Sequence, residues 1–324
     1  MALQLELLRF LADGRFHSGR DLGAALGVSR AAVWKQLRVL EAAGVRVHAV
    51  RGRGYRLAEP LELLDREAII RFLDPCSRAL LRGFELHSDI DSTNRHLMRR
   101  VSKEPVTGHV CLAECQHAGR GRRGRRWISP LGRNVYLSVL WHFSQGAARL
   151  SGLSLAVAVA VLRALRETGA EGVGVKWPND ILWKRRKLAG ILLEMSGESD
   201  GPCHVVVGVG LNVRMSPGCA DEIDQDWVDL ATIRADISRN QIAGVLIRHL
   251  LLALAAFEEE GLTPFRDEWL AADALAGVPV VLQFPASHVQ GVACGVDEIG
   301  SLVLEVDGTL RRYQSGEVSL RALT

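Results

Sequence analysis

Apolar residues recur at helical spacing near the start of the chain, at Leu5, Leu7, Leu8 and Leu11. This pattern predicts an amphipathic helix that ends near Gly14. Ser18 is a residue type that caps helices, and it predicts a second, short helix running through Leu26. Gly27 then breaks the chain before a third helix.

The third predicted helix runs from Ser29 towards Gly44. Its apolar stripe consists of Val33, Leu37 and Leu40. Alternating residues over 45–50, a glycine-rich turn at 51–54 and a return over 55–57 predict a β-hairpin. Helix, glycine turn, helix and hairpin together are typical of a winged helix-turn-helix.

Polar and basic side chains occupy the other face of this third helix and the tip of the hairpin. They are Ser29, Arg30, Lys35 and Arg38 on the helix, and Arg51 and Arg53 in the turn. Residues 1–64 hold ten Lys and Arg against six Asp and Glu, whereas residues 65–324 hold thirty against thirty-one. The basic excess therefore favours binding to DNA, with the third helix in a major groove. A three-helix protein-interaction module with solvated charges is the alternative.

Composition limits the class of protein. The 324 residues are 48% hydrophobic, which predicts a globular chain of two or three domains. The longest apolar run, around residues 153–162, is shorter than the roughly 18 residues that a membrane span needs. Glu6 and Arg9 interrupt the stretch where a signal peptide would be apolar. We therefore expect a cytoplasmic protein with no membrane partner.

The spacing of cysteine and histidine predicts reduced thiols and no structural zinc. Six cysteines occur without a C-x-x-C pair, and ten histidines form neither H-x-H nor H-E-x-x-H.

Residues 119–127 read GRGRRGRRW, with five arginines and three glycines in the first eight positions. The first six residues match G-x-G-x-x-G, but Trp127 to Pro130 follow where a dinucleotide-binding turn needs a helix. The P-loop pattern G-x-x-x-x-G-K-[ST] is absent as well. A solvated basic loop is the plain interpretation. Glycines that let the chain close over a ligand favour an anion-binding loop.

Two further polar clusters follow a linker around residues 58–64, in a segment that mixes short strands and helices. Asp91-Ser92-Thr93-Asn94 precedes a helical stretch, so it is either a helix cap or a set of polar ligands. In Lys176-Trp177-Pro178-Asn179-Asp180 a cation and a carboxylate bracket an aromatic turn, which a hairpin alone also explains. Gln116 ends a strand-like stretch before the arginine loop.

Taken together and in this order, these residues closely resemble biotin-protein ligase. With the helix-turn-helix, the resemblance is to the bifunctional type that also represses the biotin operon. It covers nearly the whole chain and rests on GRGRRGRRW, KWPND, KLAGILLE at 187–194 and GVGLNV at 208–213.

The resemblance implies a multidomain α+β fold. We expect a winged helix-turn-helix over 1–64, a central α/β ligase domain related to lipoate-protein ligases over 65–274, and a small SH3-like β-barrel over 275–324. Short alternating strands, with turns at Gly291, 297–300 and 307–308, fit the barrel.

The resemblance also implies a reaction. Such ligases join biotin to ATP as biotinyl-AMP, with Mg²⁺ accompanying the nucleotide, and then pass biotin to one lysine of a biotin carboxyl carrier protein. Fixed cations must hold the biotin carboxylate against the α-phosphate, since both are negative. Lys187, Arg122 and Arg120 are the expected catalytic residues.

By matching position, the resemblance implies two sets of binding residues. The biotin set is Ser92, Thr93, Asn94, Gln116, Arg120, Gly121, Arg122 and Lys187. The ATP set is Arg122, Arg125, Trp127, Asn179 and Asp180, with Asp180 also the expected Mg²⁺ ligand.

A glycine-hinged loop that orders over biotinyl-AMP would protect it from water. The resemblance further implies that the chain forms a homodimer when loaded with biotinyl-AMP, which is then a corepressor. Two alternatives are a DNA-binding biotin sensor without ligase turnover and a lipoate-protein ligase.

Overall fold

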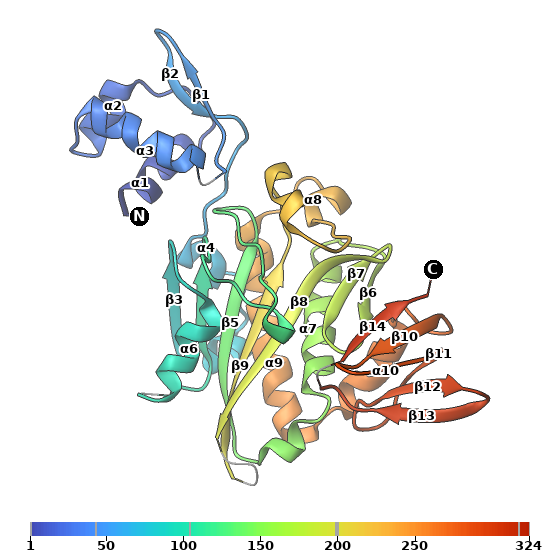
Figure 1. Ribbon diagram of the computed structural model, residues 1–324. Coiled ribbons are helices and arrows are strands. Elements are labelled where there is room, and N and C mark those ends of the chain that lie inside the picture. Colours follow the sequence, from blue (N-terminus) through green and yellow to red (C-terminus); the bar gives the residue numbers. More distant parts are fainter. Residues whose placement is uncertain (1, 43, 104, 198–200, 317, 324) are drawn as a thin grey trace.

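The N-terminal part of the chain is the predicted winged helix-turn-helix. The computed structural model describes residues 2–42, 44–103, 105–197, 201–316 and 318–323. Its first elements are α1 (Ala2–Leu11), α2 (Gly19–Ala25), α3 (Arg30–Ala42), β1 (Val47–Val50) and β2 (Gly54–Leu57). The two strands pair antiparallel, and the group stands apart from the rest of the molecule in Figure 1.

Caps and apolar faces explain these helices. The Ser18 side chain accepts a hydrogen bond from the Asp21 amide, and Ser29 Oγ accepts one from the Ala32 amide at 3.2 Å. All the predicted apolar residues of α1 and α3 except Leu5 meet in one buried core, which includes Leu7, Leu8, Leu11, Val33, Leu37 and Leu40. The apolar stripes therefore fixed the packing of this domain as expected.

A seven-stranded sheet forms the centre of the molecule, in the order β3-β4-β5-β9-β8-β7-β6. Its strands are β3 (Gly83–His87), β4 (His109–Ala113), β5 (Val135–Phe143), β6 (Val173–Lys176), β7 (Asp180–Trp183), β8 (Arg186–Gly197) and β9 (Cys203–Leu211). Neighbouring strands are antiparallel except for the parallel pair β3 and β4. The central domain is thus a mixed sheet covered by helices.

Helices cover both faces of this sheet. On one face lies α6 (Thr93–Val101), and on the other lie α7 (Leu153–Glu167) and α9 (Arg239–Glu260) (Figure 1). By length and composition α9 is the one helix of the described residues apolar enough to cross a membrane, yet 67% of its apolar window is buried inside the protein. Its apolar residues fill the core against α7, so α9 is a core helix.

Shorter helices complete the central part: α4 (Arg66–Ile70), α5 (Pro75–Leu80), α8 (Leu230–Ile233) and α10 (Thr263–Ala271). The segment that joins the helix-turn-helix to this part is anchored to it. Leu61 packs into the core of the helix-turn-helix together with Leu131 of the central domain. The buried ion pair between Arg239 and Glu114, 2.9 Å long, lies beside this segment, where Glu114 also accepts from the Leu64 amide.

The C-terminal strands form a small antiparallel sheet in the order β13-β12-β11-β10-β14, consistent with the predicted β domain. They are β10 (Pro279–Gln283), β11 (His288–Val296), β12 (Leu302–Val306), β13 (Thr309–Tyr313) and β14 (Ser319–Ala322). The turns at 297–300 and 307–308 were predicted correctly. The predicted turn at Gly291 was wrong, because Gly291 lies inside β11, where a Cβ would meet the Glu305 carbonyl at 2.6 Å.

Candidate active site and DNA-binding face

The three polar clusters of the sequence line one cavity of about 470 Å³. It lies where the first turn of α6, the β4–β5 loop, the β6–β7 turn, and strands β8 and β9 come together. Every residue expected to bind biotin or ATP lines it: Ser92, Thr93, Asn94, Gln116, Arg120, Gly121, Arg122, Arg125, Trp127, Asn179, Asp180 and Lys187. Segments from Ser92 to Leu320, far apart in sequence, are therefore neighbours here.

Hydrogen bonds order the polar end of the cavity. Ser92 is the N-cap of α6, which begins at Thr93, slightly earlier than the sequence predicted. The Thr93 amide and hydroxyl both donate to Gln116 Oε1, at 2.9 and 3.2 Å. Ser138 Oγ lies 2.7 Å from Thr93 Oγ1 and 2.6 Å from Asn94 Oδ1. The helix cap and the polar lining of the cavity are thus the same residues. Ser138 of β5, which the sequence analysis missed, supports them.

A carboxylate of β8 links this polar end to the arginine loop. Glu194 Oε2 accepts from Asn94 Nδ2 at 3.0 Å, and Glu194 Oε1 pairs with Arg120 at 2.9 Å. Glu194 ends the KLAGILLE motif but had no assigned role. It holds Arg120 against the wall of the cavity.

The arginine loop forms no α-helix, as its sequence context predicted. It contains one short 3₁₀ turn over Arg122–Gly124, in which Arg123 has a φ of 59°. Arg122 donates to Asn179 Oδ1 at 3.1 Å and to the Gly316 carbonyl of the C-terminal domain. Burial lowers the pKa of Arg122 from its ordinary value. This guanidinium is therefore a partly desolvated cation, which strengthens its attraction for an anion.

Asp180 holds two lysines at the opposite wall. Lys187 Nζ lies 2.7 Å from one carboxylate oxygen, and Lys176 Nζ lies 3.0 Å from the other. Burial alone raises the pKa of Asp180, but Lys187 and Lys176 outweigh it and lower the pKa to about 2. The cation and carboxylate that bracket the aromatic turn in the sequence are thus a direct ion pair.

Glycines make the floor on which Trp127 lies. A Cβ on Gly210 would come within 2.4 Å of the Trp127 ring, and one on Gly190 within 3.0 Å. A Cβ on Gly208 would meet Asn94 Oδ1 at 2.1 Å. Gly190, Gly208 and Gly210 therefore make room for the side chains of Trp127 and Asn94. Gly208 and Gly210 lie two residues apart on β9, so they share one face of the sheet.

Two segments that the sequence analysis missed complete the cavity. Residues 222–225 line its mouth, where Glu222 pairs with Arg126 at 3.1 Å, and residues 318–320 of the C-terminal domain line another side. Neither segment carries a motif, so only the folded chain reveals it.

The residues expected to contact DNA are exposed on the helix-turn-helix: Ser29, Arg30, Lys35, Arg38, Arg51 and Arg53. Arg38 pairs with Glu41 at 3.3 Å, and the Arg53 guanidinium stacks on Phe16 at 4.5 Å. Trp34, which the sequence analysis did not select, is 57% exposed and lies one helical turn from both Arg30 and Arg38. The basic face thus carries an aromatic side chain at its centre.

Comparisons with known proteins agree with this division. Residues 3–56 match a family model described as HTH domain, and residues 87–212 match the Biotin/lipoate A/B protein ligase family. The bifunctional ligase/repressor BirA of Escherichia coli is 43% identical over 98% of this chain and 97% of its own length. The BirA protein of Bacillus subtilis is 32% identical over 95% of both chains.

A solved structure gives the same result for three quarters of the chain. The biotin protein ligase from Aquifex aeolicus in complex with biotin and ATP is 26% identical, with a TM-score of 0.65. The match covers 75% of this chain and all of that one.

Proposed function

This chain belongs to the family of bifunctional ligase/repressors, and we propose that it is both an ATP-dependent biotin protein ligase and a biotin-responsive DNA-binding repressor. The single observation that carries the ligase activity is the cavity itself, where three cationic side chains face a polar pocket built on Ser92 to Asn94. The substrates are biotin, ATP and a lysine of a carrier protein of the acetyl-CoA-carboxylase type.

The first step joins the biotin carboxylate to the α-phosphate of ATP and releases pyrophosphate. We assign Lys187, Arg122 and Arg120 to hold these two negative groups together and to stabilise the charge of the transition state. Lys187 Nζ lies 5.6 Å from the centre of the Trp127 ring, so a base stacked on the indole would have its phosphates near the ammonium group. Asp180 is a positioning residue, because it orients Lys187 and Lys176.

Biotin requires donors and acceptors for its ureido ring. The hydroxyl and amide groups of Ser92, Thr93, Asn94 and Gln116 provide both in one buried corner. We assign this corner, with the backbone of Gly121, to biotin. Trp127, Asn179 and Arg125 we assign to ATP.

Mg²⁺ accompanies the nucleotide in such reactions, but Asp180 does not fit as its direct ligand. Both Asp180 oxygens already carry ammonium groups at 2.7 and 3.0 Å, which repel a divalent cation. Asp180 is therefore assigned to the two lysines and not to the metal.

The second step transfers biotin from biotinyl-AMP to the carrier lysine. The amine attacks the carbonyl of the mixed anhydride, the bond to phosphate breaks, and AMP leaves. Water competes with the amine, so the intermediate must be covered. The arginine loop already lies against the cavity, with Arg122 bonded to the C-terminal domain and Arg126 bonded to Glu222, and both contacts can hold it closed.

Biotin-dependent exchange between ATP and labelled pyrophosphate tests the adenylation step. We expect exchange with biotin and none with lipoate, because both family relatives cited are of the biotin type. Exchange with lipoate alone would show a lipoate ligase. No exchange with either acid would leave a biotin sensor without turnover.

Repression requires operator DNA, and we propose that loading with biotinyl-AMP makes the chain a homodimer that binds two half-sites. Because the proposed carrier protein and operator would both be cytoplasmic, we propose that the activity is cytoplasmic as well.

The double substitution Arg30→Ala and Lys35→Ala should weaken operator binding at least tenfold, because these exposed cations lie on the basic face of α3. Biotinylation should be unchanged. A mobility-shift assay on the biotin-gene promoter, with and without biotin and ATP, measures the first effect. Arg9→Ala, at the end of α1, is the control. Loss of biotinylation together with DNA binding would contradict separate sites.

A further inference from the structure

Imidazoles, a thiol and a carboxylate gather at the edge of the central sheet, away from the cavity. Glu85 and His87 lie two residues apart on β3 and therefore share one face of the strand. His109 and Cys111 do the same on β4. The two strands are parallel with Glu85 opposite Cys111, so the four side chains share one face. We call these residues, with His96 of α6, the histidine cluster.

α6 covers the face of the sheet on which the histidine cluster lies. His96 and Arg100 lie four residues apart on α6 and therefore share the face that covers the sheet. Leu97 is buried against Cys111 in the same small core. Three consecutive elements of the chain, β3, α6 and β4, thus supply one group of side chains.

Glu85 is at the centre of this group. Its Oε2 lies 2.7 Å from His96 Nε2 and 3.0 Å from His87 Nε2. Its Oε1 lies 2.8 Å from His109 Nε2 and 3.0 Å from Arg100. Each carboxylate oxygen therefore has two partners: Oε2 contacts two imidazoles, and Oε1 contacts an imidazole and a guanidinium.

Cys111 lies near His87 and His96, the two imidazoles that contact Glu85 Oε2. Ligand atoms of His87, His96 and Cys111 all lie within 4.8 Å of one another, and this is the one such group of metal-ligating side chains in the described part of the chain. Nitrogen and sulfur ligands of a tetrahedral ion bound at 2.0 to 2.3 Å lie roughly 3.5 Å apart. The three ligand atoms would therefore have to move closer together to hold such an ion.

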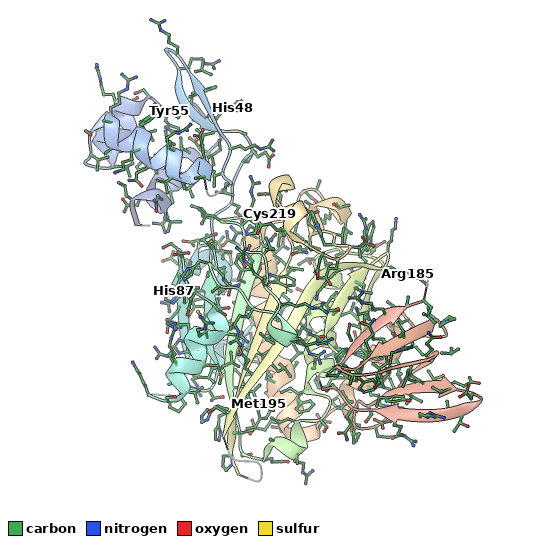
Figure 2. The ribbon with its side chains drawn as sticks, in the orientation of Figure 1. His48, Tyr55, His87, Arg185, Met195 and Cys219 are labelled. Atoms are coloured by element: carbon green, nitrogen blue, oxygen red, sulfur yellow. The ribbon has the colours of Figure 1, made fainter. Side chains whose placement is uncertain are left out.

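The local structure makes room for such a site. A Cβ on Gly83 would lie 2.3 Å from the His109 ring, so only glycine allows this imidazole to reach Glu85. Figure 2 shows His87 at the outer edge of the central sheet, on the side away from the C-terminal domain, and β3 is the edge strand. Cys111 is buried whereas His87 is partly exposed, so solvent reaches one side of the site.

We propose that His87, His96 and Cys111 bind one Zn²⁺ ion, with Glu85 Oε2 as the fourth ligand. Two imidazoles, a thiolate and a carboxylate are ligands that zinc takes in proteins, and their two negative charges balance the ion. Arg100 and His109 stay on Glu85 Oε1 and orient the carboxylate as outer partners. The ion would fasten α6 to β3 and β4, and the first turn of α6 carries the Ser92 to Asn94 corner of the cavity.

The test uses the full chain, purified without a histidine tag, freed of metal by a chelator and titrated with Co²⁺. We expect one equivalent to bind with the strong visible bands of a tetrahedral ion and a thiolate-to-cobalt charge-transfer band. Zn²⁺ should displace both. His87→Gln and His96→Gln should each weaken binding by about 100-fold, and Cys111→Ser should remove the charge-transfer band.

His142→Asn is the matched control, because His142 and His204 form another histidine pair, with ring centres 4.9 Å apart, outside the cluster. It should leave the titration unchanged. The helical circular dichroism of each metal-free variant shows whether it is folded. If Cys111→Ser does not fold, His87→Gln decides, since His87 is partly exposed on an edge strand. Absence of stoichiometric binding, or equal affinity in wild type and His87→Gln, would overturn the proposal.

Discussion

One short helix, α6, takes part in two groups of charged side chains with opposite character. Its first turn lines the cavity, where Arg120, Arg122 and Lys187 gather positive charge. Its covered face closes the histidine cluster, where a single carboxylate, Glu85, is surrounded by three imidazoles and a guanidinium. The cavity suits an anion, whereas the imidazoles, thiol and carboxylate of the cluster are ligands that suit a metal cation.

The two groups differ in how their charges are compensated. In the cavity, Arg120 and Lys187 each have a protein carboxylate, but Arg122 bonds only to neutral oxygens among its described contacts. In the histidine cluster, one carboxylate is shared by three imidazoles and the guanidinium of Arg100. The comparison teaches that cations gathered around a cavity mark the proposed phosphate site, whereas nitrogen and sulfur ligands around one carboxylate mark the proposed metal site.

Lys187→Ala should impair the reaction in the cavity and leave metal binding at the histidine cluster unchanged. We expect biotin-dependent ATP-pyrophosphate exchange to fall by about 10²- to 10³-fold, since a fixed cation next to the reacting phosphate is lost. The Co²⁺ titration should still give one equivalent. Lys184→Ala is the control, because Lys184 lies in the β7–β8 turn outside the cavity lining. Exchange within tenfold of wild type would contradict the role given to Lys187.

The low pKa of Asp180 makes the stability contributed by its ion pairs depend on pH. Its pKa is about 2 in the folded chain and near 3.8 when unfolded, so its ion pairs contribute stability above pH 4 that is lost as pH falls towards 2. Wild type should exceed Asp180→Asn by roughly 2 kcal/mol in the free energy of unfolding at pH 6, and by less at pH 3.

Urea unfolding of both proteins at the two pH values measures this difference. Asp267→Asn is the control, because the Asp267 side chain is 98% exposed and its substitution should cost the same at both pH values. A difference for Asp180→Asn that does not shrink in acid would show that Lys187 and Lys176 do not set the pKa of this carboxylate.

Contiguous motifs allowed much of the structure to be predicted. The arginine loop, KWPND and KLAGILLE each place several pocket residues within a few positions of the chain, so pattern and resemblance found them together. The stripe of Val33, Leu37 and Leu40 likewise predicted α3. Local signals of this kind survive folding because each segment keeps its own caps and faces.

The remainder depends on contacts between distant segments. Ser138 stands in an apolar strand, and its role follows only from its neighbours Thr93 and Asn94 on α6. The histidine cluster is a second case, because it forms only when β3, α6 and β4 pack together. The spacing of cysteine and histidine predicts no structural zinc, and the Co²⁺ titration tests that prediction. The residues of the cluster come from two strands and a helix, and spacing rules describe only ligands that share a segment.

Gly210→Ala asks whether the cavity depends on shape as well as on charge. The added methyl group would come within 2.4 Å of the Trp127 ring, and no charge changes. Because Gly210 does not require a positive φ, any effect comes from displacing the indole. We expect ATP affinity to fall about tenfold, by about 1.4 kcal/mol, with biotin affinity less affected, as measured by calorimetry. Gly218→Ala, whose Cβ would enter open space, is the control. Unchanged ATP affinity would show that Trp127 is not the adenine wall, and charge alone would then explain nucleotide binding.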